Sequence, residues 1–355
     1  MLFDFIKFPI WKNDGKALVN LNNLQKKQIK SFVKKVEIKE YKFVNNLCLC
    51  GNADKELDIV VAQKDRFGIA CDNILCKNCG LIRLKKRLDD NATAEFYKNE
   101  YRDIYVGKEQ ASDDFFDSQL ARGQNFYKLI EQYIDMGEVN TVFEIGCGAG
   151  GILYPFQKAG KKVSGCDFGE QYLKFGQGKG LNLYQGEIDL NKTLKGSQDL
   201  IIISHVMEHF NDPLKTMNDI IEFITPEKYL LVEVPGIFHI PKTYFNPVLY
   251  FQNAHVHNYY YYYLTIFFEA LGLDVVYGDE RCTFLLKKPN NWTKKENILV
   301  EGKEFSRWAD KVESELKKYY LLNLLKINPY YYKVGLIKVL DILGIKDRVK
   351  KILGK

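Results

Sequence analysis

The stretch Thr141–Gly151, which reads T-V-F-E-I-G-C-G-A-G-G, decides the fold. A short apolar run ends in a loop rich in glycine, and a helical pattern follows it. Glycines let the backbone turn sharply and approach a ligand at the amino end of a helix. Apolar runs and helical stretches then alternate along the chain, which is typical of a parallel α/β sheet. We therefore predict an α/β domain with a ligand-binding loop at Gly146–Gly151.

The alternation defines the expected elements of this domain. Strands are predicted at 141–146, 162–167, 181–186, 199–204 and 228–234, with helices from about 150, from about 169, near 213–223 and at Leu264–Leu271. The runs Val275–Gly278 and Thr283–Leu286 are expected to close the sheet as an antiparallel pair.

The loop is compatible with two ligands. Gly146, Gly148 and Gly151 satisfy the G-x-G-x-x-G spacing of dinucleotide-binding enzymes, and Asp167, 21 residues after Gly146, suits a ribose in either case. Glu144 lies two residues before the first glycine, where a carboxylate suits a cationic sulfonium better than a pyrophosphate. The sequence favours S-adenosylmethionine, and an NAD-dependent oxidoreductase remains the alternative.

Several stretches taken together resemble class I S-adenosylmethionine-dependent methyltransferases. Val142–Gly150 resembles their first motif, and Val163–Asp167 resembles their second strand with its ribose-binding acid. Asp199–Phe210 is similar to their fourth strand with its H-V-x-E-H turn, and Tyr229–Pro235 to their fifth strand. The resemblance covers about 140–288, and it implies a Rossmann-like methyltransferase sheet and methyl transfer from S-adenosylmethionine.

The resemblance also implies which residues hold the donor. It places the methionine part near four residues and the ribose on Asp167, while Glu187 contacts adenine and the backbone of Ser204 faces the amino group. Asp189 is the alternative to Glu187. The four residues expected at the methionine part are Glu144, Gly146, Gly148 and Gly150.

Two cysteine turns lie upstream of this domain. Cys48 and Cys50 form a C-x-C-G turn, and Cys76 and Cys79 form a C-x-x-C-G turn 28 residues later. Four thiolates from two turns suit a closed, structural tetrahedral zinc site. The arrangement is similar to the amino-terminal zinc-binding domain of bacterial sugar methyltransferases. The short C-x-C spacing leaves open that Cys71 replaces one ligand, or that the thiols are only buried.

Two histidine clusters offer a general base. His205 and Glu208 follow the fourth strand, and His209, at i+4 from His205, could share a helix face with it. His255 and His257 form the second cluster, where the resemblance to sugar methyltransferases implies a Glu-His pair with Ala254 at the glutamate position. Because histidine titrates near neutral pH, we predict His255 as the base before His205, with His257 and Glu208 as further catalytic candidates. Glu208 and His209 could instead only cap or orient their turn.

The rest of the sequence indicates organisation and partners. We expect an extension over 1–44 with a helix near 20–35, a zinc-binding module over 45–90, a helical linker over 91–138, a methyltransferase domain over 139–290 and a basic helical region over 291–355. In the linker, Asp89–Asn91 can cap a helix carrying Phe96 and Tyr97, and a second helix is expected at 113–135. Helices are predicted near 301–325, 330–342 and 345–353.

The distribution of charged and apolar residues indicates which partners and which cellular location to expect. Residues 305–355 carry 12 Lys/Arg against 5 Asp/Glu, whereas the whole chain has a net charge of +6. Such a tail favours packing or self-association, with an anionic membrane surface as the alternative and no nucleic acid expected. The lack of a signal peptide and of a spanning apolar run predicts a cytoplasmic protein with reduced thiols.

The acceptor is expected from the resemblance alone. It implies a small sugar or nucleotide-sugar of surface polysaccharide biosynthesis as the methyl acceptor. A non-catalytic, zinc-stabilised binding protein is the remaining alternative to an enzyme.

Overall fold

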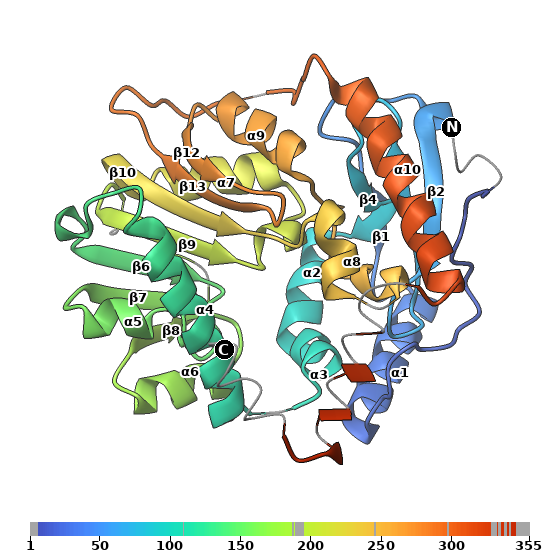
Figure 1. Ribbon diagram of the computed structural model, residues 1–355, viewed down its shortest axis with the longest axis horizontal. Helices are drawn as coiled ribbons and strands as arrows, with labels where there is room; N and C mark the ends of the chain where they lie inside the picture. Colours follow the sequence, from blue (N-terminus) through green and yellow to red (C-terminus); the bar gives the residue numbers. More distant parts are fainter. Residues whose placement is uncertain are drawn as a thin grey trace.

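The computed structural model describes residues 6–108, 110–186, 188, 195–244, 246–296, 298–327 and a few positions between 332 and 345. Its largest element is a seven-stranded sheet in the order β12-β13-β10-β9-β6-β7-β8 (Figure 1). The strands are β6 (Thr141–Ile145), β7 (Lys162–Asp167), β8 (Asn182–Gln185), β9 (Gln198–Ser204), β10 (Ile224–Glu233), β12 (Asp274–Gly278) and β13 (Thr283–Lys287).

The pairing confirms the predicted Rossmann-like sheet. Strands β8, β7, β6, β9 and β10 run parallel to one another, and β13 runs antiparallel to both β10 and β12. In a parallel sheet the carboxyl ends of the strands lie at one edge, where ligands bind. Glu144, Asp167, Ser204 and Glu233 all lie at or next to that end of their strands.

Both faces of this sheet are covered, because successive side chains of a strand point to opposite faces. Val142 and Ile202 pack with α4 (Asp113–Ile130), α5 (Tyr154–Lys158) and α6 (Glu170–Gly178) on one face. Phe143 and Ile203 pack on the other face with α7 (Pro213–Ile221) and α9 (Tyr261–Ala270). The helix predicted from about 150 begins only at Tyr154, since the glycine loop continues into turns.

A second, four-stranded sheet has the order β11-β4-β3-β2. Its strands are β2 (Asp58–Lys64), β3 (Ala70–Cys76), β4 (Ile82–Leu84) and β11 (His257–Asn258), and β1 (Phe43–Asn45) pairs separately with β5 (Lys86–Leu88). Strand β11 comes from the methyltransferase part of the chain. The sheet of the cysteine module is therefore completed by a strand from a distant part of the chain.

Helices connect the two sheets. The predicted cap at Asp89 is confirmed, since its side chain accepts from the backbone of Ala92 at the start of α2 (Asp90–Phe96). A π-helical turn η2 (Tyr97–Tyr101) continues into α3 (Arg102–Tyr105), which contacts α1 (Asn23–Glu37). In Figure 1, α2 and α3 lie between the seven-stranded sheet and α1.

The carboxyl-terminal helix α10 (Phe305–Leu324) lies beside the four-stranded sheet (Figure 1). Lys77 of the cysteine module forms ion pairs with Asp310 at 2.8 Å and Glu313 at 2.6 Å on this helix. The helices predicted at 330–342 and 345–353 lie largely outside the described residues. In the part of the chain that the structure describes, no helix is long and apolar enough to cross a bilayer.

Candidate functional site

The glycine loop is shaped by its contact with the turn after β9. Gly146, Gly148 and Gly150 have φ values of +71°, +56° and +75°, a region that favours glycine. A Cβ atom on Gly146 would lie 2.4 Å from the side chain of Val206. Residue 146 must therefore be glycine for the loop to pack against the turn that carries His205 and Glu208.

Glu144 is a buried acid at the start of this loop. It is 1% exposed, and its Oε2 atom has no hydrogen-bond partner among the described residues. Burial raises the pKa of Glu144 well above its ordinary value, and the nearby charge of Asp167 adds to the effect. A buried carboxylate that lacks a partner is costly, so this atom is suited to a cationic group of a ligand.

Asp167, the predicted ribose acid, already has several donors. Its Oδ2 accepts from the Gly148 amide at 2.9 Å, and its Oδ1 accepts from the Gly169 amide at 2.7 Å and from the Arg102 guanidinium. Arg102 comes from α3 and lies 4.4 Å above the ring of Tyr172. The sequence did not predict Arg102 as a site residue, because nothing in its local pattern indicates a contact with a residue 65 positions away.

Ser204, predicted to face the amino group of the donor, contacts two charged residues. The Ser204 hydroxyl donates to Glu233 at 3.1 Å and accepts from Arg122 of α4 at 3.4 Å. The sequence did not predict Arg122 or Glu233 as site residues. Glu233 is nevertheless the last residue of its strand, as Asp167 and Ser204 are of theirs. Glu187 and its alternative Asp189 lie outside the described residues.

Glu208 stands at the centre of a histidine cluster. Its side chain is 2% exposed, and neither carboxylate oxygen has a hydrogen-bond partner among the described residues. The Oε1 atom lies 3.5 Å from His205 Nδ1 and 3.9 Å from the Nε2 atoms of both His209 and His255. The structure thus brings together residues from both predicted histidine clusters.

The histidines differ in exposure and backbone. His205 has a φ of +56° and precedes the short 3-10 helix η4 (Met207–His209), so the expected shared helix face with His209 does not form. The side chain of His205 is 36% exposed, and its Nε2 lies 3.6 Å from Glu233. Burial lowers the pKa of His209 and, more strongly, that of His255, which keeps both rings neutral.

His257 lies apart in β11, opposite Arg83 of β4, and stacks on Tyr259 at 6.1 Å between ring centres. Burial lowers the pKa of His257 to about 3. Its ring is therefore neutral over the whole physiological range, and it belongs to the small sheet rather than to the group around Glu208.

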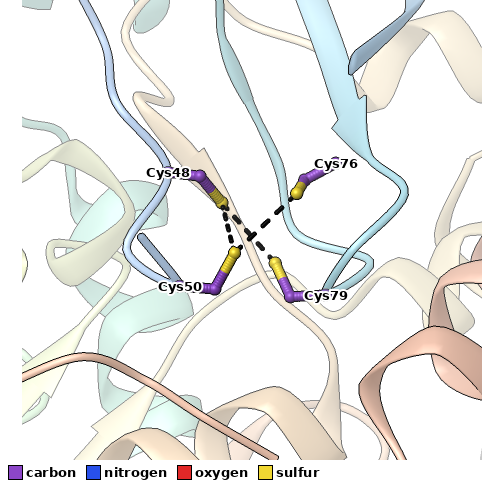
Figure 2. A group of neighbouring side chains, drawn as sticks. All are labelled: Cys48, Cys50, Cys76 and Cys79. Carbon is purple, nitrogen blue, oxygen red and sulfur yellow. Dashed lines mark hydrogen bonds between the residues drawn. The ribbon is translucent and has the colours of Figure 1, made fainter. Parts of the chain in front are cut away.

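The four predicted cysteine ligands converge in the module, as Figure 2 shows. Cys48 Sγ lies 3.5 Å from Cys50 and from Cys79, and Cys50 Sγ lies 3.9 Å from Cys76. Hydrogen bonds from the neighbouring sulfurs, Cys48 first, lower the pKa of Cys50 and Cys76. Zn–S distances of about 2.3 Å put the sulfurs of a tetrahedral zinc roughly 3.8 Å apart, so the donor set fits this metal.

Cys71 is not part of this group. It lies in β3 and its sulfur accepts from the Asn73 amide at 3.6 Å. Gly51 and Gly80, each directly after a cysteine turn, have φ values of +75° and +78°. These glycines let both turns, including the short C-x-C turn, direct their sulfurs inward.

A pocket adjoins His209 between the module, the linker and the η4 turn. Its cavity volume is about 20 Å³, and its lining combines the aromatic rings of Phe96 and Tyr97 with polar groups. The polar residues that line it are Arg87, Thr93, His209, Asn211 and Asn253. The Oδ1 atom of Asn211 is buried without a hydrogen-bond partner among the described residues. The groups that line this small space are of the kinds that contact a hydroxyl-bearing ligand.

Comparisons with known proteins agree with this geometry. Residues 116–277 match the family model described as a methyltransferase domain. No curated protein matches the chain with significance.

Among solved structures, an S-adenosylmethionine-dependent methyltransferase from Mesorhizobium loti is 16% identical, with 32% of this chain and 56% of that chain covered and a TM-score of 0.28. One from Archaeoglobus fulgidus is 19% identical, with 60% and 90% covered and a TM-score of 0.36. Phosphoethanolamine N-methyltransferase 1 of Haemonchus contortus, in complex with phosphoethanolamine and S-adenosylhomocysteine, is 12% identical, with 64% and 54% covered and a TM-score of 0.39.

These likenesses are too distant to add to the argument, and the chain spans little more than half the length of the Mesorhizobium loti protein. The functional interpretation rests instead on the family match, on the order of the seven strands and on the acid that precedes the glycine loop. Over residues 116–277, the chain is therefore similar to a methyltransferase domain, and its sheet order and glycine loop agree with that match.

Proposed function

We propose that the protein transfers a methyl group from S-adenosylmethionine to a small sugar-type acceptor, free or nucleotide-linked, of surface polysaccharide biosynthesis. The observation that carries the donor assignment is the buried carboxylate of Glu144, which has an unpartnered oxygen beside the glycine loop. A sulfonium nucleoside with an amino-acid head carries positive charge, and it would give this carboxylate the partner that it lacks.

The donor would lie along the carboxyl ends of β6, β7 and β9. Glu144 and the backbone of Gly146, Gly148 and Gly150 would hold the methionine part, and Asp167 the ribose. The glycine loop contacts Val206, the residue after His205, which supports a donor position near this histidine. Proximity of donor and acceptor is a large part of what a methyltransferase supplies.

Proton removal from the acceptor is assigned to His205. Sequence alone favoured His255, but the side chain of His255 is 5% exposed and that of His205 is 36% exposed. His205 also lies between two acids, Glu208 at 3.5 Å and Glu233 at 3.6 Å. Methyl transfer then forms the acceptor–CH₃ bond, breaks the S–CH₃ bond and releases S-adenosylhomocysteine.

The acceptor class is supported by the pocket beside His209. Thr93, Asn211 and Asn253 offer hydrogen bonds, and the rings of Phe96 and Tyr97 offer a flat apolar wall. Sugars combine these two kinds of surface. Arg87, whose guanidinium donates to Leu88 O at 3.0 Å and to Asp90 at 3.3 Å, has further N–H groups for an anionic substituent such as a phosphate.

The cysteine group is proposed to hold a structural zinc ion. Zinc bound by Cys48, Cys50, Cys76 and Cys79 would have no open coordination position, so it would stabilise the module and take no part in methyl transfer. The module in turn provides Leu84, Arg87 and Leu88 to the wall of the acceptor pocket.

The proposal is tested in two steps on the full chain. Calorimetry should detect S-adenosylhomocysteine binding, and a panel of sugars and nucleotide-sugars should reveal conversion of the donor to S-adenosylhomocysteine. His205→Ala should lower kcat by about a hundredfold or more, the usual contribution of a general base, and leave donor affinity near that of the wild type. Absence of donor binding by well-folded protein would refute the proposal, and binding of NAD in its place would favour an oxidoreductase.

A further inference from the structure

We propose that Glu208, His209 and His255 form a second metal site, which binds a divalent transition-metal ion beside the acceptor pocket. This inference goes beyond the proposed methyl transfer, and metal binding can be measured without turnover. The site is separate from the cysteine module, since it lies at the η4 turn after β9 and its ligand atoms are nitrogen and oxygen.

The first observation is the state of the Glu208 carboxylate. Its side chain is 2% exposed, and both oxygens lack a hydrogen-bond donor among the described residues. Buried carboxylates in folded proteins are paired, hydrogen-bonded or bound to a metal. Three imidazoles surround Glu208, but the nearest atom, His205 Nδ1, lies 3.5 Å away, and the other two lie at 3.9 Å. The separations leave room for a small cation between the groups.

The second observation is the orientation of the His209 ring. Its Nδ1 lies 2.9 Å from the carbonyl oxygen of Ala254, so Nδ1 carries the proton and donates to that oxygen. The Nε2 atom of the neutral ring is then an acceptor, and it lies 3.4 Å from the Tyr101 hydroxyl and 3.9 Å from Glu208 Oε1. Histidines that bind metals usually donate their other N–H to a carbonyl or carboxylate in this way.

The spacing of the ligand atoms fits a transition-metal ion. One atom from each of Glu208, His209 and His255 can be chosen so that all three lie within 4.8 Å of one another. Metal–nitrogen and metal–oxygen distances of about 2.1 Å put the ligand atoms of a tetrahedral ion about 3.4 Å apart. The 3.9 Å separations from Glu208 Oε1 to the two Nε2 atoms are slightly wider, so small side-chain rotations complete the site.

The nature of the ligands selects the class of ion. Two neutral imidazoles and one carboxylate suit Zn²⁺, Fe²⁺, Co²⁺ or Mn²⁺, whereas Ca²⁺ and Mg²⁺ prefer oxygen ligands. The Tyr101 hydroxyl lies 3.4 Å from His209 Nε2, and it would have to give up this long hydrogen bond.

Three protein ligands leave coordination positions open, unlike the closed cysteine site. His209, one of the three ligands, also lines the pocket together with Tyr97 and Asn253. A hydroxyl oxygen of the acceptor could therefore bind to the ion and become more acidic, while His205 remains free to take its proton.

The experiment compares metal content in the full-length wild type and in matched variants. Protein is loaded with Zn²⁺, freed of excess metal and analysed by mass spectrometry, alone and with the variants His255→Ala, Glu208→Gln and Cys76→Ser. The wild type should hold a second metal ion per chain that His255→Ala and Glu208→Gln lose and Cys76→Ser retains. His239→Ala, a histidine of η5 (Ile237–His239) away from the cluster, should retain both ions.

A spectroscopic measurement on the wild type tests the same proposal without depending on whether the variants fold. Co²⁺ should produce d–d absorption of a nitrogen- and oxygen-bound ion in addition to the sulfur-to-metal charge-transfer bands of the cysteine site. The proposal is overturned if the wild type shows sulfur-bound cobalt only. It is equally overturned if His255→Ala, with unchanged S-adenosylhomocysteine binding as its folding control, keeps the metal content of the wild type.

Discussion

Glu144 shows how a binding residue can oppose the stability of the protein. Burial raises the pKa of its carboxyl group, with a contribution from Asp167, so the charged form is disfavoured in the folded protein without donor. A carboxyl group whose pKa is raised on folding lowers stability as pH rises from the unfolded pKa towards the folded one. The same charged form is the one that attracts the cationic donor.

Glu144→Gln should therefore separate stability from binding. We expect the variant to bind S-adenosylhomocysteine at least about tenfold more weakly, since a charge-assisted hydrogen bond is worth roughly 1.5–3 kcal/mol. Its melting temperature without ligand should equal or exceed that of the wild type at pH 8. Wild-type affinity should rise with pH through the raised pKa of Glu144, and the variant should lose this dependence. Calorimetry across pH 6–8 and thermal unfolding measure both effects.

Glu170→Gln is the matched control, because this side chain is 57% exposed on α6 and, among the residues that the structure describes, pairs only with Lys174. It should change neither the affinity nor its pH dependence. An unchanged affinity in Glu144→Gln would show that Glu144 does not contact the donor.

The linker helix α3 affects the donor site through one ion pair. Arg102 donates to Asp167, and its guanidinium packs on Tyr172 beside Gly169. The ribose hydroxyls of a donor would compete with Arg102 for the same carboxylate. Donor binding would then require α3 to shift, and through Tyr105, which donates to Asn253, the shift would reach the acceptor pocket.

Arg102→Ala should consequently bind S-adenosylhomocysteine more tightly, by about fivefold, because the competing ion pair of roughly 1 kcal/mol is gone. The acceptor KM should rise, since α3 no longer holds its position. Calorimetry and steady-state kinetics measure the two changes. Arg307→Ala, an exposed arginine of α10, should alter neither quantity. Weaker donor binding in Arg102→Ala would mean that Arg102 is itself a donor ligand.

The elements that sequence could predict are those defined by local patterns. The alternation of strands and helices from Thr141 to Leu286, the cap at Asp89 and the helix α4 all depend on neighbouring residues, and the structure has them. Contacts between distant segments leave no such pattern. The pairing of β11 with β4, the approach of Arg102 to Asp167 and the meeting of His209 with His255 are set by tertiary packing alone.

At the scale of the whole molecule, we expect the seven-stranded sheet to bind the donor and the cysteine module to help bind the acceptor. Glu144 and Asp167 lie on the seven-stranded sheet, whereas the acceptor pocket is bounded by Leu84 and Arg87 of the cysteine module. The Tyr260 hydroxyl, just before α9, donates to the carbonyl of Cys79 at 2.6 Å and ties these two parts together. Loss of zinc should therefore weaken acceptor binding more than donor binding.

Cys76→Ser should lower the zinc content and the melting temperature, by roughly 5 °C or more if at least about 2 kcal/mol of metal-dependent stability is lost. Its affinity for S-adenosylhomocysteine should stay within about twofold of the wild type, while the acceptor KM rises. Cys71→Ser, whose sulfur lies outside the cluster, should behave as the wild type in all three measurements. A parallel loss of donor affinity in Cys76→Ser would mean that the module and the large sheet unfold together, so that zinc stabilises the donor site as much as the acceptor pocket.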